Sequence, residues 1–322
     1  MRITSTLLIL ACSISPFANT IKAAEQSNSN NSMLCEDHTV SYRTITIDNV
    51  KMFYREAGPQ DGTTILMLHG FPSSSRMFAG LIPQLADRYH VIAPDYPGFG
   101  HSDAPPPEQF TYTFDHLADI IQKFTDRLQI ERYVLLMQDY GGPVGFRLAL
   151  AKPEKVIALI IQNAVAHEEG LSTLWEPRRA FWRDRAANEE AVRKNLTSFA
   201  ATRQRHVGNS PHPERIDPDT WTDEYAFLTR PGMDRIQLEL FYDYQTNVAS
   251  YPKWQAYLRE HRPRTLVVWG KYDPSFTVAG ALAYGKDVPD AEIHLLNAGH
   301  FALDEEPDLI RDLIRRFLDR LH

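Results

Sequence analysis

Cysteine is scarce in this chain, because its 322 residues contain only two, Cys12 and Cys35. Cys12 lies in an apolar N-terminal segment that we expect to be removed, and Cys35 is then left without a partner. No intrachain disulfide is therefore expected to support the mature fold. Stability must come from a packed core, and the 43% hydrophobic content is enough for one large α/β domain or two smaller ones.

A surplus of positive charge is also missing. Lys and Arg together number 34 against 41 Asp and Glu, which gives a net charge of -7. Proteins that bind nucleic acid or anionic membrane surfaces usually carry a basic surface. We therefore expect neither as the main partner of this chain.

The N-terminal apolar run is too short to cross a membrane. Residues 6–17, "TLLILACSISPF", fall short of the roughly 20 residues that a spanning helix needs. Arg2 before the run and small residues after it predict a signal peptide over residues 1–24, and hence export to the periplasm or the medium. The alternative is a first core element. The polar stretch "EQSNSNNS" that follows cannot pack, so we expect residues 25–41 to form a disordered linker.

Apolar strands alternate with helical segments along most of the chain, with no internal repeat. Continuous apolar runs are typical of strands buried on both faces, and the alternation predicts a mostly parallel sheet with helices on both faces. The expected strands are 42–48, 51–57, 63–70, 90–95, 133–138, 156–164, 264–270 and 291–297. The alternation stops near residue 166. We therefore predict one α/β core over 42–165 and 263–322, interrupted by a helical insertion over 166–262.

The stretch "LLMQDYGGPVGF" places a carboxylate where a predicted buried strand ends. It is close to G-x-S-x-G, a sharp strand-to-helix turn that exposes a nucleophile and needs small neighbours. Here Asp139 occupies the nucleophile position, and Met137 replaces the first glycine. A serine esterase or lipase is therefore not expected, whereas a carboxylate can attack an alkyl carbon and form an ester on the enzyme. The alternative is that Asp139 only caps the following helix.

A second pattern, "LHGFPSSS", follows the first long buried strand. In folds with this kind of turn, such a loop donates one backbone N–H to an oxyanion hole, and the residue after the nucleophile donates another. The two donors here would be the N–H groups of Phe71 and Tyr140. Taken alone, the pattern is also compatible with an ordinary Gly-Pro turn.

Two further candidates follow the last two predicted strands. Asp273 in "GKYDP" is the candidate acid, because the end of the preceding strand carries the neutral Asn163. His300 in "LNAGHFALDEEP" is the candidate base. Each could be a turn residue or a structural histidine. The chain order Asp139, Asp273, His300 nevertheless matches the nucleophile–acid–histidine order of one fold.

These motifs together resemble the α/β-hydrolase family, and within it the epoxide hydrolases and haloalkane dehalogenases that use an aspartate nucleophile. The motifs are "HGFPSSS", "DYPGFGHSD", "QDYGGPVGF", "WGKYDP" and "GHFALDEEP", and the resemblance covers residues 42 to 320. It implies that the insertion at 166–262 is a helical cap over the active site. It also implies a small apolar substrate and no cofactor or metal.

The same resemblance favours an epoxide over a halide as the substrate group. Related dehalogenases hold the halide with N–H donors, usually a Trp after the nucleophile together with an Asn in the oxyanion loop or a Trp of the cap. This chain has Tyr140 and Phe71 at the first two positions. Epoxide hydrolases need a phenol of the cap to protonate the opening oxygen. The resemblance across "LFYDYQTN" makes Tyr244 our first choice for that proton donor.

Three alternatives stay open at the level of sequence. The chain could be a haloalkane dehalogenase that uses the same covalent mechanism. It could bind ligands in this fold without catalysis, although a complete Asp–Asp–His set argues against that. Tyr244 could belong to an aromatic helix face that packs on the core, as could its neighbours Tyr225, Tyr242 and Tyr251.

Overall fold

An eight-stranded, mostly parallel sheet forms the centre of the computed structural model, which describes residues 39–321. The strands lie in the order β1-β2-β4-β3-β5-β6-β7-β8, and β2 runs antiparallel to both of its neighbours. Their bounds are β1 Ser41–Ile47, β2 Val50–Ala57, β3 Thr64–Leu68, β4 His90–Pro94, β5 Tyr133–Gln138, β6 Val156–Gln162, β7 Arg264–Gly270 and β8 Glu292–Leu296. The predicted α/β architecture is confirmed. The predicted signal peptide and nearly all of the predicted linker lie outside the described residues and stay predictions.

The first hairpin turns one residue earlier than the sequence suggested. Asp48 and Asn49 form its tip with φ values of 46° and 66°, so both adopt the left-handed conformation. Two such residues in succession are typical of a two-residue hairpin turn, in which Asp and Asn are well tolerated. Val50 is consequently the first residue of β2 and is buried.

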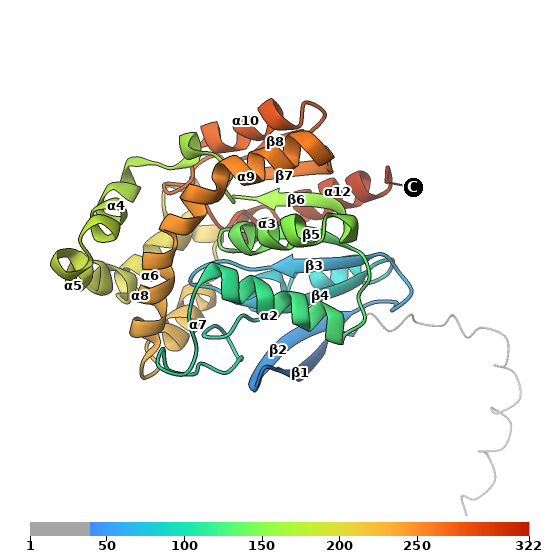
Figure 1. Cartoon of the computed structure of the whole chain (residues 1–322). Coiled ribbons are helices and arrows are strands. Elements are labelled where there is room, and N and C mark those ends of the chain that lie inside the picture. Colours follow the sequence, from blue (N-terminus) through green and yellow to red (C-terminus); the bar gives the residue numbers. More distant parts are fainter. Residues whose placement is uncertain (1–38, 322) are drawn as a thin grey trace, which may run out of the picture. The chain divides into compact units, whose positions relative to one another are not determined.

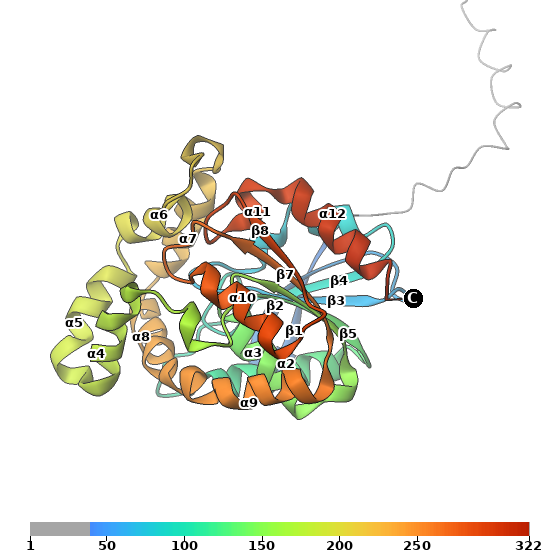
Figure 2. The ribbon, with the colours of Figure 1, turned by 90° about the horizontal axis from the view of Figure 1, so that it is seen from above.

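Helices cover both faces of the sheet (Figures 1 and 2). The helices α2 (Phe114–Arg127), α3 (Gly141–Ala151) and α10 (Val278–Asp287) share one apolar cluster with one face, whereas α1 (Ile82–Leu85) and α12 (Pro307–Leu318) share another cluster with the opposite face. Successive residues of β5 alternate between the two clusters, as the pleat requires. Both faces of the central strands are therefore buried, which explains their continuous apolar sequences.

The insertion after β6 lies at the carboxyl ends of the parallel strands (Figure 1). It contains α4 (Glu176–Arg183), α5 (Arg185–Leu196), α6 (Phe199–Val207), α7 (Asp219–Leu228) and α8 (Met233–Asp243). In parallel sheets of this kind, ligands bind at this edge. The insertion is thus placed to cover a site, and we call these five helices the cap.

Helix α9 (Gln245–His261) departs from the expected boundary at residue 262. It runs beside α3 and α10 along the sheet (Figure 2), and the ring of Trp254 stacks on Phe146 of α3 at 5.1 Å between centroids. Its N-terminal end, which directly follows α8, approaches the cap. Neither α9 nor the cap contains the continuous apolar run of a buried strand. The sequence pattern alone therefore could not show where the cap ends and α9 begins. A short helix, α11 (Ala302–Glu305), completes the fold.

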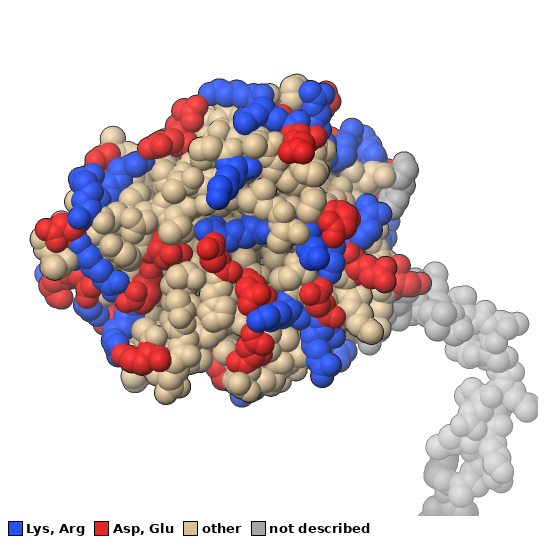
Figure 3. Space-filling view, in the orientation of Figure 1, with Lys and Arg blue, Asp and Glu red and all other residues tan. Residues whose placement is uncertain are grey.

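Acidic and basic side chains are interspersed on the face shown in Figure 3. Within residues 39–321, no helix combines the length and the apolar character required to cross a membrane. The same residues contain no group of three or more His, Cys, Asp or Glu side chains arranged to hold a metal ion.

Candidate active site

The turn between β5 and α3 holds Asp139 in a strained backbone conformation. Its φ is 48°, which is rare for a residue with a side chain and is frequently found at functional sites. The following glycines are required by close packing. A Cβ on Gly141 would lie 2.0 Å from the carbonyl oxygen of Leu68, and one on Gly145 would lie 2.1 Å from the sulfur of Met137. The sequence "DYGGPVG" therefore allows α3 to sit directly against β3 and β5.

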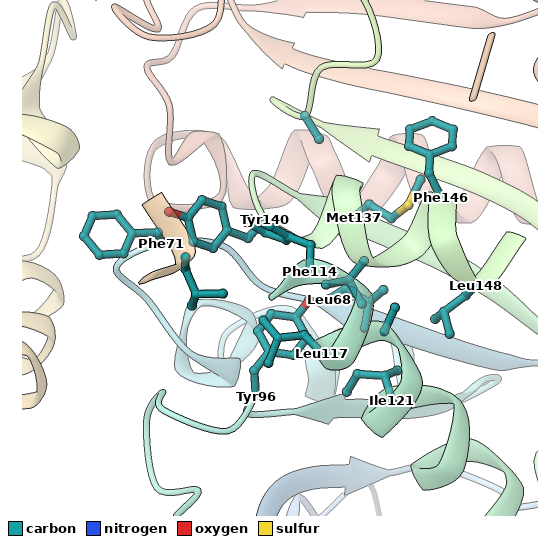
Figure 4. Close-up of a cluster of buried hydrophobic side chains, with 14 of the residues drawn as sticks. Leu68, Phe71, Tyr96, Phe114, Leu117, Ile121, Met137, Tyr140, Phe146 and Leu148 are labelled. Carbon is teal, nitrogen blue, oxygen red and sulfur yellow. The ribbon is translucent and has the colours of Figure 1, made fainter. Parts of the chain in front are cut away.

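The Asp139 carboxylate faces the loop after β3. The N–H of Phe71 donates to its Oδ1 at 2.8 Å, and the N–H of Tyr140 also faces the carboxylate. Its side chain does not cap α3, whose N-cap residue is Tyr140 without a side-chain hydrogen bond. Burial raises the pKa of Asp139, while His300 and these two N–H groups oppose that rise. Figure 4 shows Phe71 and Tyr140 at one end of the apolar cluster, with ring centroids 5.8 Å apart.

His300 and Asp273 form a tight pair at the ends of β8 and β7. The distance from His300 Nδ1 to Asp273 Oδ2 is 2.6 Å. Burial lowers the pKa of His300, but the charge of Asp273, then its hydrogen bond and the charge of Asp139, outweigh burial and leave the pKa raised. The other ring nitrogen, Nε2, lies 3.8 Å from Asp139 Oδ2. The three side chains therefore converge, and Nε2 faces the oxygen of Asp139 that is not held by Phe71.

Asn163 fixes the orientation of Asp273. Its side-chain amide donates to Asp273 Oδ2 at 2.8 Å, and its Oδ1 accepts from the N–H of Gly270 at 2.8 Å. The other carboxylate oxygen of Asp273 accepts the N–H groups of Ser275 and Phe276. These hydrogen bonds hold the carboxyl group of Asp273 in one position. The neutral residue at the end of β6 thus positions the acid at the end of β7.

All six predicted site residues line one buried cavity of about 60 Å³, which we call the inner cavity: Phe71, Asp139, Tyr140, Tyr244, Asp273 and His300. Tyr244 lies between α8 and α9 and is 2% exposed. Within residues 39–321 its hydroxyl forms no hydrogen bond of normal geometry, although the hydroxyl of Tyr251 is close enough to interact with it. Burial raises the pKa of Tyr244 well above its usual value, so the phenol keeps its proton at neutral pH.

The tryptophans near the inner cavity have their N–H groups occupied. Trp175 lines the cavity and donates to the carbonyl oxygen and the hydroxyl of Ser275, both at 3.2 Å. Trp182 donates to the carbonyl oxygen of Phe241 at 2.8 Å. Neither indole is free to hold a departing halide in this conformation.

Comparison with known proteins identifies the family of this fold. Residues 63–307 match the family model described as "alpha/beta hydrolase fold". The chain belongs to the α/β-hydrolase family. It is 43% identical over 263 residues to an uncharacterized hydrolase of Saccharomyces cerevisiae, with 80% of this chain and 89% of that protein covered. It is 37% identical over 282 residues to a Mycobacterium tuberculosis protein named haloalkane dehalogenase 2, with 80% and 88% covered. A solved structure titled epoxide hydrolase CorEH superposes with a TM-score of 0.72 at 18% identity, covering 88% of this chain and all of that one.

Four residues at the site of this α/β hydrolase were not identified from sequence. Asn163 was noted only as a neutral residue, and Gln138 was not considered, although its amide lies 2.9 Å from His300 Nε2. Arg178 and Arg205 line the inner cavity from α4 and α6. The position of Asn163 at a strand end was a usable signal. The two arginines gave none, because the cap contains many charged residues at similar spacing.

Proposed function

We propose that this α/β hydrolase opens an epoxide to a vicinal diol through an ester on Asp139. The observation that carries the proposal is the pairing of a free carboxylate oxygen with a protonated phenol in one cavity. Asp139 Oδ2 is not bound by the oxyanion-loop N–H of Phe71 and would attack a ring carbon. The carbon–oxygen bond of the ring then breaks, and Tyr244 gives its proton to the departing oxygen.

The second half-reaction uses His300. Its Nε2 takes a proton from water, and the hydroxide attacks the carbonyl carbon of the ester. Negative charge then develops on Oδ1, which already accepts the N–H of Phe71. Collapse of this intermediate breaks the Cγ–Oδ2 bond, and the hydroxyl added from water gives its proton to the departing oxygen, which releases the diol and restores the carboxylate. The proton held by His300 returns to the tyrosinate. The charge of Asp273 stabilises the imidazolium in between.

Gln138 has a place in this sequence of steps. In the present conformation its amide donates to His300 Nε2, at the position where the water would have to lie. We therefore infer that the Gln138 amide moves aside, or turns its oxygen toward the water, before ester hydrolysis. Within residues 39–321 its Oε1 is buried without a partner, so it is available to accept a hydrogen bond from that water while His300 takes the proton.

Haloalkane dehalogenation is the second candidate, because a relative at 37% identity carries that name. It would use the same Asp139 ester, with halide as the leaving group. The occupied indoles of Trp175 and Trp182 argue against it, because neither can donate its N–H to a departing halide in this conformation. The unpartnered phenol of Tyr244 favours the epoxide.

Trapping of the intermediate tests both candidates. His300→Ala should retain much of the attack by Asp139 and lose ester hydrolysis, so intact-mass spectrometry should reveal a stable adduct. An epoxide adds its whole mass, whereas a haloalkane adds only its alkyl part. His294→Ala, on β8 and outside the cavity, is the matched control and should turn over normally.

Peptide mapping should place the adduct on the fragment that contains "QDYGG". If the wild type turns over substrate while His300→Ala never forms an adduct there, water attacks the substrate directly. The proposal of a covalent Asp139 ester would then be wrong.

A further inference from the structure

Two guanidinium groups enter the inner cavity from different helices of the cap. Arg178 comes from α4 and Arg205 from α6, and both line the cavity together with Asp139. Within residues 39–321 neither forms a salt bridge with an acidic side chain, and Nη1 of Arg178 is buried without a hydrogen-bond partner. Arg178 lies over the ring of Trp175 at 4.3 Å, and Arg205 lies over Phe71 at 4.8 Å. Aromatic faces therefore position both cations without neutralising them.

Other arginines of the cap have different surroundings. Arg179, next to Arg178, bonds Glu168 at 2.7 Å, and Arg193 on α5 bonds Glu189 at 2.8 Å. Arg203 on α6 is exposed to solvent. The two arginines that face the cavity therefore lack a carboxylate partner, although carboxylates are abundant on this cap and pair with Arg179 and Arg193.

Both side chains are partly buried, and leaving their charges unpaired costs stability. Buried charges are normally paired, because removal from water is expensive. Burial lowers the pKa of Arg178, and burial followed by the charge of Arg178 lowers the pKa of Arg205 to about 10. The two cations repel each other, and a bound anion would relieve both the repulsion and the unsatisfied donors.

The arginines lie where the inner cavity meets a larger one. This outer cavity, of about 350 Å³, shares Arg178, Arg205 and Phe241 with the inner cavity and extends between α4, α5 and α6. A substrate whose reactive carbon lies at Asp139 would therefore place a substituent beside both guanidinium groups. The volume of the outer cavity accommodates a further part of the molecule.

We propose that the substrate carries an anionic group, most simply a carboxylate, which Arg178 and Arg205 bind together. This inference rests on the proposed function for the reactive group and makes the substrate class an epoxy-carboxylate. It revises the expectation of an apolar substrate that came from the sequence. Arginine is suited to this task because its planar donors match a carboxylate.

Binding of an unreactive pair of ligands tests the anion site independently of any reaction. Cyclopropanecarboxylate and cyclopropanecarboxamide have the same shape and differ in charge, and calorimetry gives Kd for each. The wild type should bind the carboxylate roughly 10- to 100-fold more tightly than the amide, the range expected for charged hydrogen bonds. In Arg178→Met and in Arg205→Met the ratio of the amide Kd to the carboxylate Kd should fall toward one. Arg179→Met and Arg203→Met, which change neighbours on the same helices, should keep it.

Thermal unfolding of each variant shows whether it is folded, and Arg178→Lys provides a second test if Arg178→Met is not. Lysine keeps the charge but loses the planar fork, so the ratio should be reduced and not abolished. The proposal is overturned if the wild type shows no preference for the carboxylate, or if the preference survives in both methionine variants.

Turnover separates this inference from the proposed function. Oxirane-2-carboxylate and oxirane-2-carboxamide form the reactive counterpart of the same pair, and diol formation is measured for each. Hydrolysis of both without a preference for the acid would overturn the anion site and leave the epoxide hydrolase in place. A charge preference in binding without hydrolysis of either would support the anion site and count against epoxide hydrolysis.

Discussion

The two oxygens of the Asp139 carboxylate have different surroundings, and this difference assigns them different tasks. Oδ1 accepts the N–H of Phe71, whereas Oδ2 lies 3.8 Å from His300 Nε2 and faces the cavity. A carboxylate held by one oxygen can attack with the other without losing its position. In the reaction that we propose, the oxygen that carries the negative charge of the tetrahedral intermediate is therefore already in place.

At the same scale, Tyr244→Phe removes the phenol that we assign as the proton donor. We expect epoxide alkylation of Asp139 to slow by about 10²- to 10⁴-fold, the usual contribution of general acid catalysis, or by less if Tyr251 shares the role. Single-turnover kinetics with an epoxide measure this step. Tyr242→Phe, on the same helix and outside the inner cavity, is the matched control. An unchanged alkylation rate in Tyr244→Phe would exclude it as the principal donor.

The raised pKa of His300 predicts how the rate of ester hydrolysis depends on pH. Burial lowers its pKa, but the charge of Asp273 outweighs burial, so that the pKa lies above the usual 6.5. Only the neutral imidazole can accept a proton from water. The rate of ester hydrolysis should therefore fall as the pH decreases through this raised pKa. Rapid-quench measurements of ester decay across pH would show it.

Asp273→Asn tests whether the charge of Asp273 causes the raised pKa of His300. Without the carboxylate the pKa of His300 should decrease, and the acidic limb of the profile should move to lower pH, with a slower maximal rate because the imidazolium loses its partner. Asp287→Asn is a useful comparison, because that residue is also buried and pairs with His167 instead. A limb that stays in place in Asp273→Asn would show that another group titrates.

At the scale of elements, the junction of β3, β5 and α3 depends on glycine. Gly141→Ala would bring a Cβ within 2.0 Å of the Leu68 carbonyl oxygen and 2.8 Å of its carbonyl carbon, which are backbone atoms of a central strand. Such overpacking typically costs about 1–3 kcal/mol or more, and urea denaturation measures it. Gly80→Ala should have little effect, because no atom lies within 4 Å of the added carbon. Equal effects of the two substitutions would contradict this account of the turn.

The sequence predicts the strand ends well and the cap poorly, for a physical reason. Apolar runs such as 133–138 determine where a buried strand stops, and parallel strands stop at the same edge, so Asp139, Asp273 and His300 could be placed there from pattern alone. The direction in which a cap helix turns its side chains depends on packing between distant segments. Arg178 was for that reason not recognised.

At the scale of the whole molecule, a buried histidine connects the cap to the core. His206 of α6 bonds Glu224 of α7 at 2.6 Å and Asp304 of α11 at 3.2 Å. Burial lowers its pKa, but the two carboxylates outweigh burial and raise the pKa to about 9. The ring also stacks on Phe301, the neighbour of His300, at 4.0 Å between centroids. The charge of one side chain therefore contributes to holding the cap against the catalytic end of the sheet.

This connection predicts a loss of stability at alkaline pH. Because the folded pKa of His206 is raised, its contribution is complete below the unfolded value near 6.5 and is lost as the pH rises through about 9. The contribution is on the order of 2–4 kcal/mol. Denaturant unfolding between pH 6 and 10 should show the decrease in the wild type and a smaller one in His206→Asn. His212→Asn, which changes a partly exposed histidine, is the control, and an equal pH dependence in wild type and His206→Asn would contradict the assignment.

The position of the cap between β6 and α9 separates two kinds of residue along the chain. Asp139, Asp273 and His300, to which we assign the chemistry, belong to the core, whereas Arg178 and Arg205, which we propose select the substrate, lie within one continuous insertion. Genetic recombination at the two ends of this insertion would exchange substrate selectivity between two related enzymes. The residues of the core that we assign to the chemistry would be unchanged. Diversification of such enzymes can therefore proceed by recombination, without passing through inactive ancestors.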